Sequence, residues 1–392
     1  MKKPIYLDYH ATTPVDPRVF SVMKKFFLED FGNPGSNSHE YGDIAAKAMN
    51  DAREEIGIAM NSISPSEVIF VSGATEANNL AIHGTAIKLK EAGKPHIITS
   101  AIEHKAVLDV TDELERQGFQ VTYVQPNSEG FTDPQKIENA ITPETGLISI
   151  MHANNEIGII NDIKRIGEIA EKHNILFHCD AAQSFGKIPI DVQEMNVHLL
   201  SISAHKIYGP KGIGALYVRK KHPKVEIEPL LFGGGQERGL RPGTLATPLI
   251  AGLAEASRIA REEMASESKR LQNLRDSLFS GLDEKCPDIV LNGSIENRLP
   301  NNLNLSFLGV NSESLMINLR GEVAVSNGSA CTSANWTSSH VLAGMGIDDE
   351  RIQSAIRFSL GRFTTQEEID YAIDQISQVV QRLRNTSMQA SL

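Results

Sequence analysis

Short apolar runs alternate with amphipathic helical stretches along the middle of the chain, and this pattern narrows the possible folds. Strand-like runs occur at EVIFVS (67–72), HIITS (96–100), FQVTYV (119–124), GLISIMHA (146–153), ILFHCDA (175–181), LLSISA (199–204) and GALYV (214–218). The segments ATEANNLAIHGTAIKLK, KAVLDVTDELERQG and DIKRIGEIAEKHN have apolar residues at helical spacing. This succession predicts an α/β fold, with a mainly parallel sheet and helices on both faces. Ligands bind such sheets at the carboxyl ends of the strands, so polar residues that follow a strand are candidates for function.

The chain changes character after Pro248. An Ala-, Glu- and Arg-rich run from about residue 249 to 284 predicts one extended helix that leaves the first domain. It is followed by NLNLSFLG, a glycine- and serine-rich loop, SAIRFSLG and the amphipathic run QEEIDYAIDQISQVVQRLRN. We therefore expect a large domain over residues 16–255. We expect residues 1–15 and 256–392 to form a small α+β domain.

Composition excludes several classes of protein. Hydrophobic residues make up 41% and charged residues 22%, as in an ordinary soluble enzyme, and the formal charge of −11 argues against direct nucleic-acid binding. No apolar stretch is long enough for a membrane span, and MKKPIYLDYHATTP contains no apolar leader, so we expect a cytoplasmic protein. The three cysteines form no C-x-x-C pair, which predicts neither a disulfide framework nor a metal site.

Lys206 is the most informative residue of the chain. It lies in SISAHKIYGPKGIG, directly after an apolar strand and before a Gly-Pro turn. Burial lowers the pKa of a lysine and exposes the free amine that forms a Schiff base. A plain charge at a strand end is the alternative.

Asp180 ends another apolar strand, in ILFHCDAAQS. A carboxylate there needs a cationic partner, and the protonated ring nitrogen of pyridoxal phosphate (PLP) would be one. Gln183, three residues on, could reach the phenolic oxygen of the ring. Helix capping is the alternative for Asp180.

Three further strand ends carry polar candidates. SGATEANN (72–79) places a glycine turn before Ala74 and Thr75 at a helix start, where backbone N–H groups can hold a phosphate. His104, in EHKAV, could stack on a flat ring and relay protons, or it could cap a helix. Asn155, in HANNEIG, could bind the cofactor or a substrate carboxylate, or it could belong to a turn.

Cys331 lies in SNGSACTSANWTSS (326–339), a stretch of small and polar residues that predicts an exposed, usable thiol. Cys179, within an apolar strand, is expected to be buried, and Cys286, beside Pro287, to lie on the domain surface. Arg357, in IRFSLGR, could bind a carboxylate through two hydrogen bonds, or it could form a surface ion pair.

The assembled motifs resemble the NifS/IscS group of cysteine desulfurases, in the class-V aminotransferase family and the type I fold of PLP enzymes. They run from near residue 5 to beyond residue 360: YLDYHATTPVDPRV, FGNPGSNSH, SGATEANNLAI, EHKAVLD, SIMHANNEIG, HCDAAQS, SAHKIYGPKGIGALYV, GGGQERGLRPGT, GSACTS and IRFSLGRFTT. Two positions depart from the family pattern, His10 and Cys179, and we expect neither to abolish activity.

The resemblance implies a role for each candidate. Lys206 would hold PLP covalently, with His104 stacked on the ring. Asp180 would pair with the ring nitrogen and Gln183 with the phenolic oxygen. Ligands of the phosphate would be Ala74, Thr75, Ser203, His205 and, from the second subunit of a homodimer, Thr244. Asn155 would contact cofactor and substrate, and Arg357 the substrate.

The family chemistry implies that L-cysteine becomes L-alanine. Lys206 is the candidate base for the α-proton, and the Cys331 thiolate would take the sulfur as a persulfide and pass it to an acceptor protein. That acceptor would serve iron–sulfur cluster assembly or nucleic-acid thiolation. The motifs SNGSACTS and QERGLRPGT are also similar to those of desulfurases that supply sulfur for DNA phosphorothioation.

IscS-type enzymes continue with a C-terminal segment that docks the iron–sulfur scaffold protein. The sequence given ends with QRLRNTSMQASL and does not show that segment, which argues against this partnership. Two other hypotheses remain: a PLP lyase or aminotransferase in which Cys331 is incidental, and a non-catalytic scaffold that binds partners.

Overall fold

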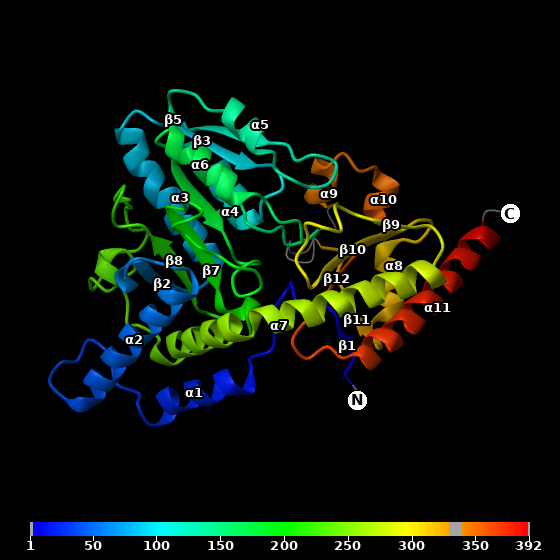
Figure 1. Ribbon diagram of the computed structural model, residues 1–392, viewed down its shortest axis with the longest axis horizontal. Coiled ribbons are helices and arrows are strands. Elements are labelled where there is room, and N and C mark those ends of the chain that lie inside the picture. The colour runs from blue at the N-terminus through cyan, green and yellow to red at the C-terminus, as the bar shows by residue number, and fades with distance from the viewer. Residues whose placement is uncertain (1–2, 329–338, 391–392) are drawn as a thin grey trace.

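A seven-stranded sheet forms the centre of the larger part of the protein. The computed structural model describes residues 3–328 and 339–390. The strand order is β2-β8-β7-β6-β5-β3-β4 (Figure 1). The strands are β2 (Val68–Val71), β3 (His96–Ser100), β4 (Gln120–Val124), β5 (Thr145–Ser149), β6 (Leu176–Asp180), β7 (Leu199–Ser203) and β8 (Gly214–Val218). Only β8 is antiparallel to its neighbours, so the prediction of a mainly parallel sheet is confirmed.

Helices cover both faces of this sheet, as predicted. One face is packed by α3 (Ala74–Glu91) and α4 (Lys105–Arg116). The other is packed by α1 (Pro17–Leu28), α2 (Glu40–Ala59), α5 (Pro134–Asn139), α6 (Ile163–Lys172) and the start of α7 (Thr247–Lys285). Because both faces are covered, the inner strands are buried along their length and read as continuous apolar runs.

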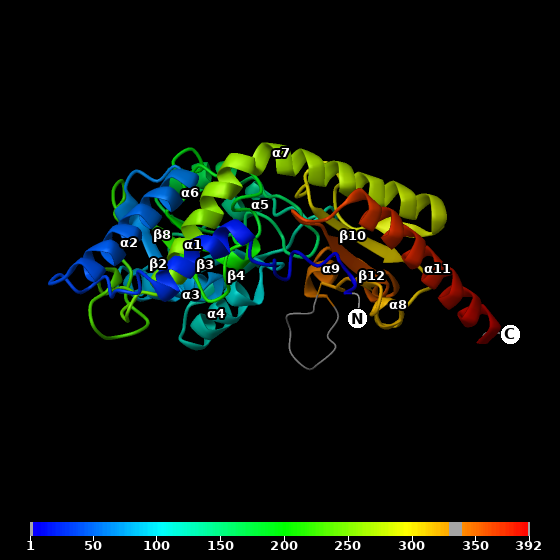
Figure 2. The same cartoon turned by 90° about the horizontal axis from the view of Figure 1, so that it is seen from below.

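Helix α7 connects the two parts of the protein (Figure 2). Its first half packs Ile250 and Leu253 against the large sheet, and its second half packs Leu278 and Leu282 into a separate core. The separate core lies on an antiparallel sheet in the order β12-β10-β9, made of β9 (Ile289–Leu291), β10 (Asn302–Phe307) and β12 (Ala355–Ser359). The predicted extended helix is therefore present, and our division at residues 255 and 256 falls inside it. That boundary remains a proposal.

The remaining elements complete the smaller part. They are β1 (Ile5–Tyr6), β11 (Val323–Ala324), α8 (Ser312–Leu319), α9 (His340–Gly344), α10 (Asp349–Gln353) and α11 (Gln366–Ala390). Three short 3-10 turns lie in the larger part, η1 (Pro65–Glu67), η2 (Ala204–Lys206) and η3 (Glu237–Gly239). Strand β1 pairs with β11, and Leu7 enters the smaller core, so the N-terminal segment packs there as expected.

Cys286 is buried, which corrects the expectation that it lies on the surface. It follows the last turn of α7 and packs in the smaller core, with Sγ 3.5 Å from Ser377 Oγ of α11. The adjacent Pro287 suggested a loop, but the packing of α7 on α11 covers the thiol. Burial raises the pKa of Cys286.

Within the described residues, no helix combines the length and the apolar character needed to cross a membrane. The same residues contain no cluster of His, Cys, Asp and Glu suited to a metal ion.

Three buried histidines lie in or next to the strands of the large sheet. His178 lies between Ser149 Oγ (2.8 Å) and Ser201 Oγ (3.0 Å), and His152 and His198 are each 4% exposed. Burial lowers the pKa of each from 6.5 to about 4. Each is therefore neutral in the folded protein at neutral pH and takes up a proton on unfolding once the pH falls below 6.5.

We predict that the free energy of unfolding falls as the pH is lowered from 6.5 towards 4. Urea titrations at several pH values measure this slope. His178→Gln removes one titrating group and should reduce the slope by about one proton. The exposed His222→Asn should leave the slope unchanged, and equal slopes for the two variants would contradict the prediction.

Candidate active site

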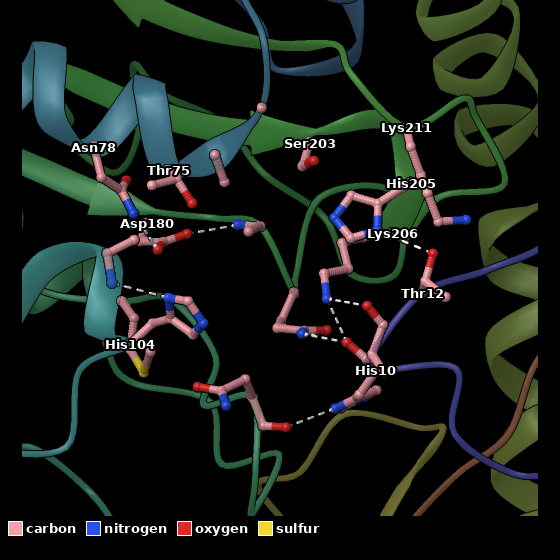
Figure 3. A pocket seen from close by; sticks show the side chains of 18 of the residues that line it. His10, Thr12, Thr75, Asn78, His104, Asp180, Ser203, His205, Lys206 and Lys211 are labelled. Atoms are coloured by element: carbon pink, nitrogen blue, oxygen red, sulfur yellow. Dashed lines mark hydrogen bonds between the residues drawn. The ribbon is translucent and has the colours of Figure 1, made fainter. Parts of the chain in front are cut away.

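A cavity of about 570 Å³ lies where β6 and β7 end and α3 and α4 begin (Figure 3). The N-terminal segment closes one side of it. Most residues that the sequence singled out line this one cavity: Ala74, Thr75, His104, Asn155, Asp180, Gln183, Ser203, His205, Lys206 and Arg357. Residues that are distant in sequence thus meet at the carboxyl edge of the sheet.

Two predicted residues are not in this lining. Thr244 is exposed and does not line the cavity of its own chain. Cys331 lies outside the described residues.

Several lining residues were not predicted as site residues, namely His10, Ala11, Thr12, Asn78, Met151 and Lys211. The first three belong to the motif YHATTP and the fourth to SGATEANN, so the motifs themselves were visible in the sequence. What the sequence did not reveal is that residues 10–12 lie beside Lys206, because that contact spans almost two hundred residues.

Lys206 follows β7 through the single turn of η2. Its Nζ donates to the carbonyl oxygens of His10 and Ala11, the second at 2.8 Å. The expectation of a lysine directly after a buried strand is therefore confirmed. The two backbone carbonyls hold the amine at the cavity wall.

Asp180, the last residue of β6, is only 6% exposed. Its Oδ2 accepts from Asn78 Nδ2 (2.7 Å) and its Oδ1 from the N–H of Ala182 (2.9 Å). Among the residues described, no basic side chain forms an ion pair with this carboxylate. A buried carboxylate oriented by neutral donors fits a cationic group of a ligand.

The start of α3 is an open anion site. Gly73 precedes the helix and has no side chain to cap it, so the N–H groups of Ala74 and Thr75 are left for another acceptor. Ser203, His205 and Lys211 stand across from it (Figure 3). Burial, followed by repulsion from Lys206, lowers the pKa of His205 to about 4, so its imidazole is neutral at pH 7.

His104 caps α4 and also lines the cavity. Its Nδ1 accepts from the N–H of Ala106 at 3.1 Å, which leaves the proton of the neutral ring on Nε2. Burial lowers its pKa. Of the two alternatives that the sequence left open, the structure shows the capping role, and stacking of His104 on a ring remains a proposal.

Arg357 is 1% exposed, so the alternative of a surface ion pair is wrong. Its guanidinium contacts Asp8 Oδ1 (2.7 Å) and the carbonyl oxygen of Asn155 (3.0 Å). The Nε of Arg357 and the Oδ1 of Asn155 are buried and have no hydrogen-bond partner among the residues that the structure describes. Buried polar groups are rarely left unpaired, so this wall of the cavity is suited to a polar ligand.

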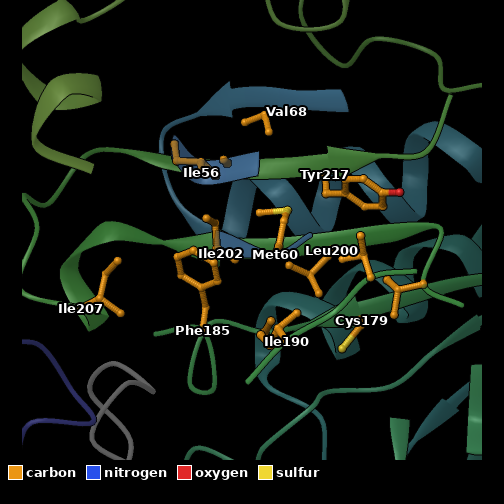
Figure 4. Close-up of a cluster of buried hydrophobic side chains, with 14 of the residues drawn as sticks. Ile56, Met60, Val68, Cys179, Phe185, Ile190, Leu200, Ile202, Ile207 and Tyr217 are labelled. Carbon is orange, nitrogen blue, oxygen red and sulfur yellow. The ribbon is translucent and has the colours of Figure 1, made fainter. Parts of the chain in front are cut away.

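The sheet face covered by α1, α2, α5, α6 and α7 packs into a core of buried apolar side chains (Figure 4). Cys179 packs there with Leu200 and Ile202 and is fully buried, as predicted. Burial raises its pKa well above the usual range, so the thiol stays protonated.

The approach of β8 to the start of α3 gives a test of the anion site. A Cβ at Gly214 would lie 2.5 Å from the carbonyl oxygen of Ile202 and 2.8 Å from Gly73 Cα, and backbone atoms cannot move away as side chains do. We predict that Gly214→Ala displaces the Gly73 turn and weakens binding of PLP at least about tenfold, measured by absorbance titration. Gly321→Ala, with no atom within 4 Å of its Cβ, is the matched control. Equal affinities of the two variants for PLP would contradict the expectation that the start of α3 holds the phosphate.

Comparisons with known proteins agree with this geometry. The family model "Aminotransferase class-V" matches residues 5–372. The cysteine desulfurase IscS of Serratia proteamaculans (strain 568) is 54% identical over 99% of this chain and 95% of its own length. A solved NifS-like protein superposes with a TM-score of 0.90 at 40% identity, covering 97% of this chain and all of that one.

A further solved structure, SspA in complex with cysteine, has a TM-score of 0.81 at 42% identity and covers 93% of this chain and 100% of its own. The fold, the lining of the cavity and these full-length similarities agree with one another. The chain belongs to the class-V aminotransferase family of PLP fold type I enzymes and, within it, to the NifS/IscS group of cysteine desulfurases.

Proposed function

We propose that this enzyme uses PLP to convert L-cysteine to L-alanine, with the sulfur held as a persulfide on Cys331. The observation that carries the proposal is the composition of one cavity. A lysine amine, a buried carboxylate without an ionic partner and an open helix start lie together in it. These match the aldehyde, the ring nitrogen and the phosphate of PLP.

The residues of this chain fit the cofactor one by one. Lys206 would bind the aldehyde carbon, Asp180 the ring nitrogen and Gln183 the phenolic oxygen. Ala74, Thr75, Ser203 and His205 would hold the phosphate, and His104 would cover the ring. Bound PLP supplies an electron sink that makes the α-proton of an amino acid acidic.

Substrate binding is assigned to the wall that contains Asn155 and Arg357. The unpartnered Nε of Arg357 is a donor suited to the α-carboxylate, and Asn155 Oδ1 is an acceptor suited to an N–H. Lys206, once freed, would take the α-proton. His104, neutral and protonated on Nε2, can donate a proton within the cavity.

Cys331 is proposed from the sequence alone, since it lies outside the described residues. The residues on either side of that gap support the assignment. Ser339 Oγ donates to Glu156 Oε2 (2.6 Å), and Gly328 lies against the same carboxyl group, next to Asn155 of the cavity wall. In the proposed step, the Cys331 thiolate attacks the substrate sulfur, and the carbon–sulfur bond of the substrate breaks. Alanine forms once the carbon that has lost the sulfur is protonated.

The sulfur would then pass to an acceptor protein in the cytoplasm. We propose acceptors of iron–sulfur cluster assembly or nucleic-acid thiolation, in keeping with the similarity to IscS. DNA phosphorothioation is the second candidate, and the motifs SNGSACTS and QERGLRPGT favour it. Assays of sulfur transfer from the labelled persulfide to purified acceptors of each pathway would separate these candidates.

A homodimer is proposed because Thr244 is exposed and does not line the cavity of its own chain. The segment before it exposes Leu231 by 50% and Phe232 by 87%, an apolar surface that a second copy would cover. Thr244 would then reach the phosphate site of the partner.

We predict that Cys331→Ser binds PLP with an unchanged visible spectrum but loses alanine formation from cysteine by at least about a thousandfold. Lys206→Ala should lose both the covalent cofactor and the activity. Cys286→Ser removes a thiol from the smaller core and should still form alanine. Persistent alanine formation by Cys331→Ser would favour a lyase or aminotransferase, and a wild-type protein without a cofactor band would favour a scaffold.

The dimer proposal predicts complementation between two defective chains. A Lys206→Ala homodimer should be inactive, and a Thr244→Ala homodimer should bind PLP weakly. In a hybrid of the two, one cavity combines an intact Lys206 with Thr244 of the other chain, so that cavity should regain normal PLP affinity and alanine formation. Hybrids purified through two different tags measure this, and no recovery would show that Thr244 does not act across an interface.

A further inference from the structure

Lys187 lies behind the cavity and is connected to Lys206 by three hydrogen bonds. Its Nζ donates to Gln183 Oε1 at 3.1 Å, and Gln183 Nε2 donates to the carbonyl oxygen of His10 at 3.0 Å. The same carbonyl oxygen accepts from Lys206 Nζ. Lys187 is not among the residues that line the cavity, and its hydrogen bond to a lining residue goes to Gln183.

The side chain of Lys187 has an unusual environment for a lysine. It is half-buried, and across the described ranges, 3–328 and 339–390, no carboxylate forms an ion pair with it. Burial, followed by repulsion from Lys206, lowers its pKa to about 7; Glu267 opposes this and Arg357 adds to it. An amine buried without a carboxylate partner costs stability whether it loses its proton or keeps it, so a role in the site explains its presence better than a role in folding.

The hydrogen bond from Lys187 determines which way the amide of Gln183 faces. An ammonium has only donors, so it selects the amide oxygen and turns the NH₂ group towards the cavity. One hydrogen of that NH₂ reaches His10, and the second is available for a ligand oxygen. A charged donor on the oxygen also polarises the amide and strengthens the NH₂ group as a donor.

We propose that Lys187 is a positioning residue of the cofactor site, which orients the Gln183 amide and keeps a positive charge behind the nitrogen of Lys206. The inference rests on the proposed function, because it assumes PLP on Lys206. A nearby positive charge disfavours a proton on the Lys206 nitrogen, so that nitrogen loses its proton at lower pH than it would without Lys187.

Other charged groups surround Lys187. Lys206, Arg357 and Glu267 act on it directly, and His10, whose own pKa is lowered by burial and by Lys187, is neutral. An adjoining cavity of about 490 Å³ adds Arg261, Glu262, Arg275, Glu296 and Arg298. The phosphate of a bound cofactor would add negative charge and favour the ammonium form of Lys187.

The test compares Lys187→Met and Lys187→Arg with a matched control, Lys269→Met, which removes an exposed lysine of α7. The first measurement is the pH midpoint of the absorbance change of the PLP-loaded proteins. We expect the midpoint of Lys187→Met to rise by about one pH unit, and those of Lys187→Arg and Lys269→Met to stay near that of the wild type. The second measurement follows labelling of Lys206 in the cofactor-free proteins with an amine-specific acylating reagent as a function of pH. The labelling midpoint should shift in the same direction.

Equal midpoints for Lys187→Met and Lys269→Met would overturn the proposal. So would a Lys187→Arg protein that behaves like Lys187→Met, because the charge would then have no effect. If Lys187→Met does not fold, Lys187→Gln carries the same expectation. Failure of the proposed function would look different: no protein, wild type included, would form the visible band, while the labelling of Lys206 would still report on Lys187.

Discussion

The parallel pairing of β6 with β7 is the constraint on which the site depends. Cys179 pairs with Leu200 and Asp180 with Ser201, so β6 ends two residues before the end of β7 at the same edge of the sheet. One strand end therefore supplies the carboxylate, and the other leads within one turn to Lys206. The carboxylate and the amine are both positioned by these apolar strands, whose buried side chains form the core on one face of the sheet.

The N-terminal segment closes one side of the cavity at this edge of the sheet. Leu7 is anchored in the smaller core, and Thr13 is hydrogen-bonded to the backbone of His205 and Tyr208 in the larger part. Between these anchors, the carbonyls of His10 and Ala11 meet the amine of Lys206, and Asp8 meets Arg357. The segment thus joins the side of the cavity that contains Lys206 to the side that contains Arg357, and its position depends on both cores.

What could be predicted from the sequence follows the range of the interactions. The strands of the large sheet, helix α7 and the strand-end positions of Lys206 and Asp180 are determined locally, by apolar runs and the residues next to them, and they were predicted. Helices α1 and α2 were not predicted from the sequence. The contacts of Asn78 with Asp180 and of Lys187 with Gln183 also depend on tertiary packing, which a residue pattern does not report. The prediction that Cys286 lies on the surface was wrong, because the proline beside it suggested a loop, whereas the packing of α7 on α11 buries it. Thr244 was named from family resemblance alone, and nothing in its local sequence indicates which subunit it serves.

The charges around the cavity explain how an acidic protein can attract an anion. The chain carries a net charge of −11, yet Lys206 and Lys211 line a cavity whose histidines are held neutral. Of the acidic lining residues, Glu76 is already paired with Arg241, which leaves Asp180 as the carboxylate that faces the ligand. Field lines concentrate in a pocket with low-dielectric walls, so this local excess of positive charge acts on a phosphate more strongly than the distant surface charges do. Because the histidines add no positive charge at neutral pH, the lysines and the helix start would supply most of the attraction for the phosphate of the proposed cofactor.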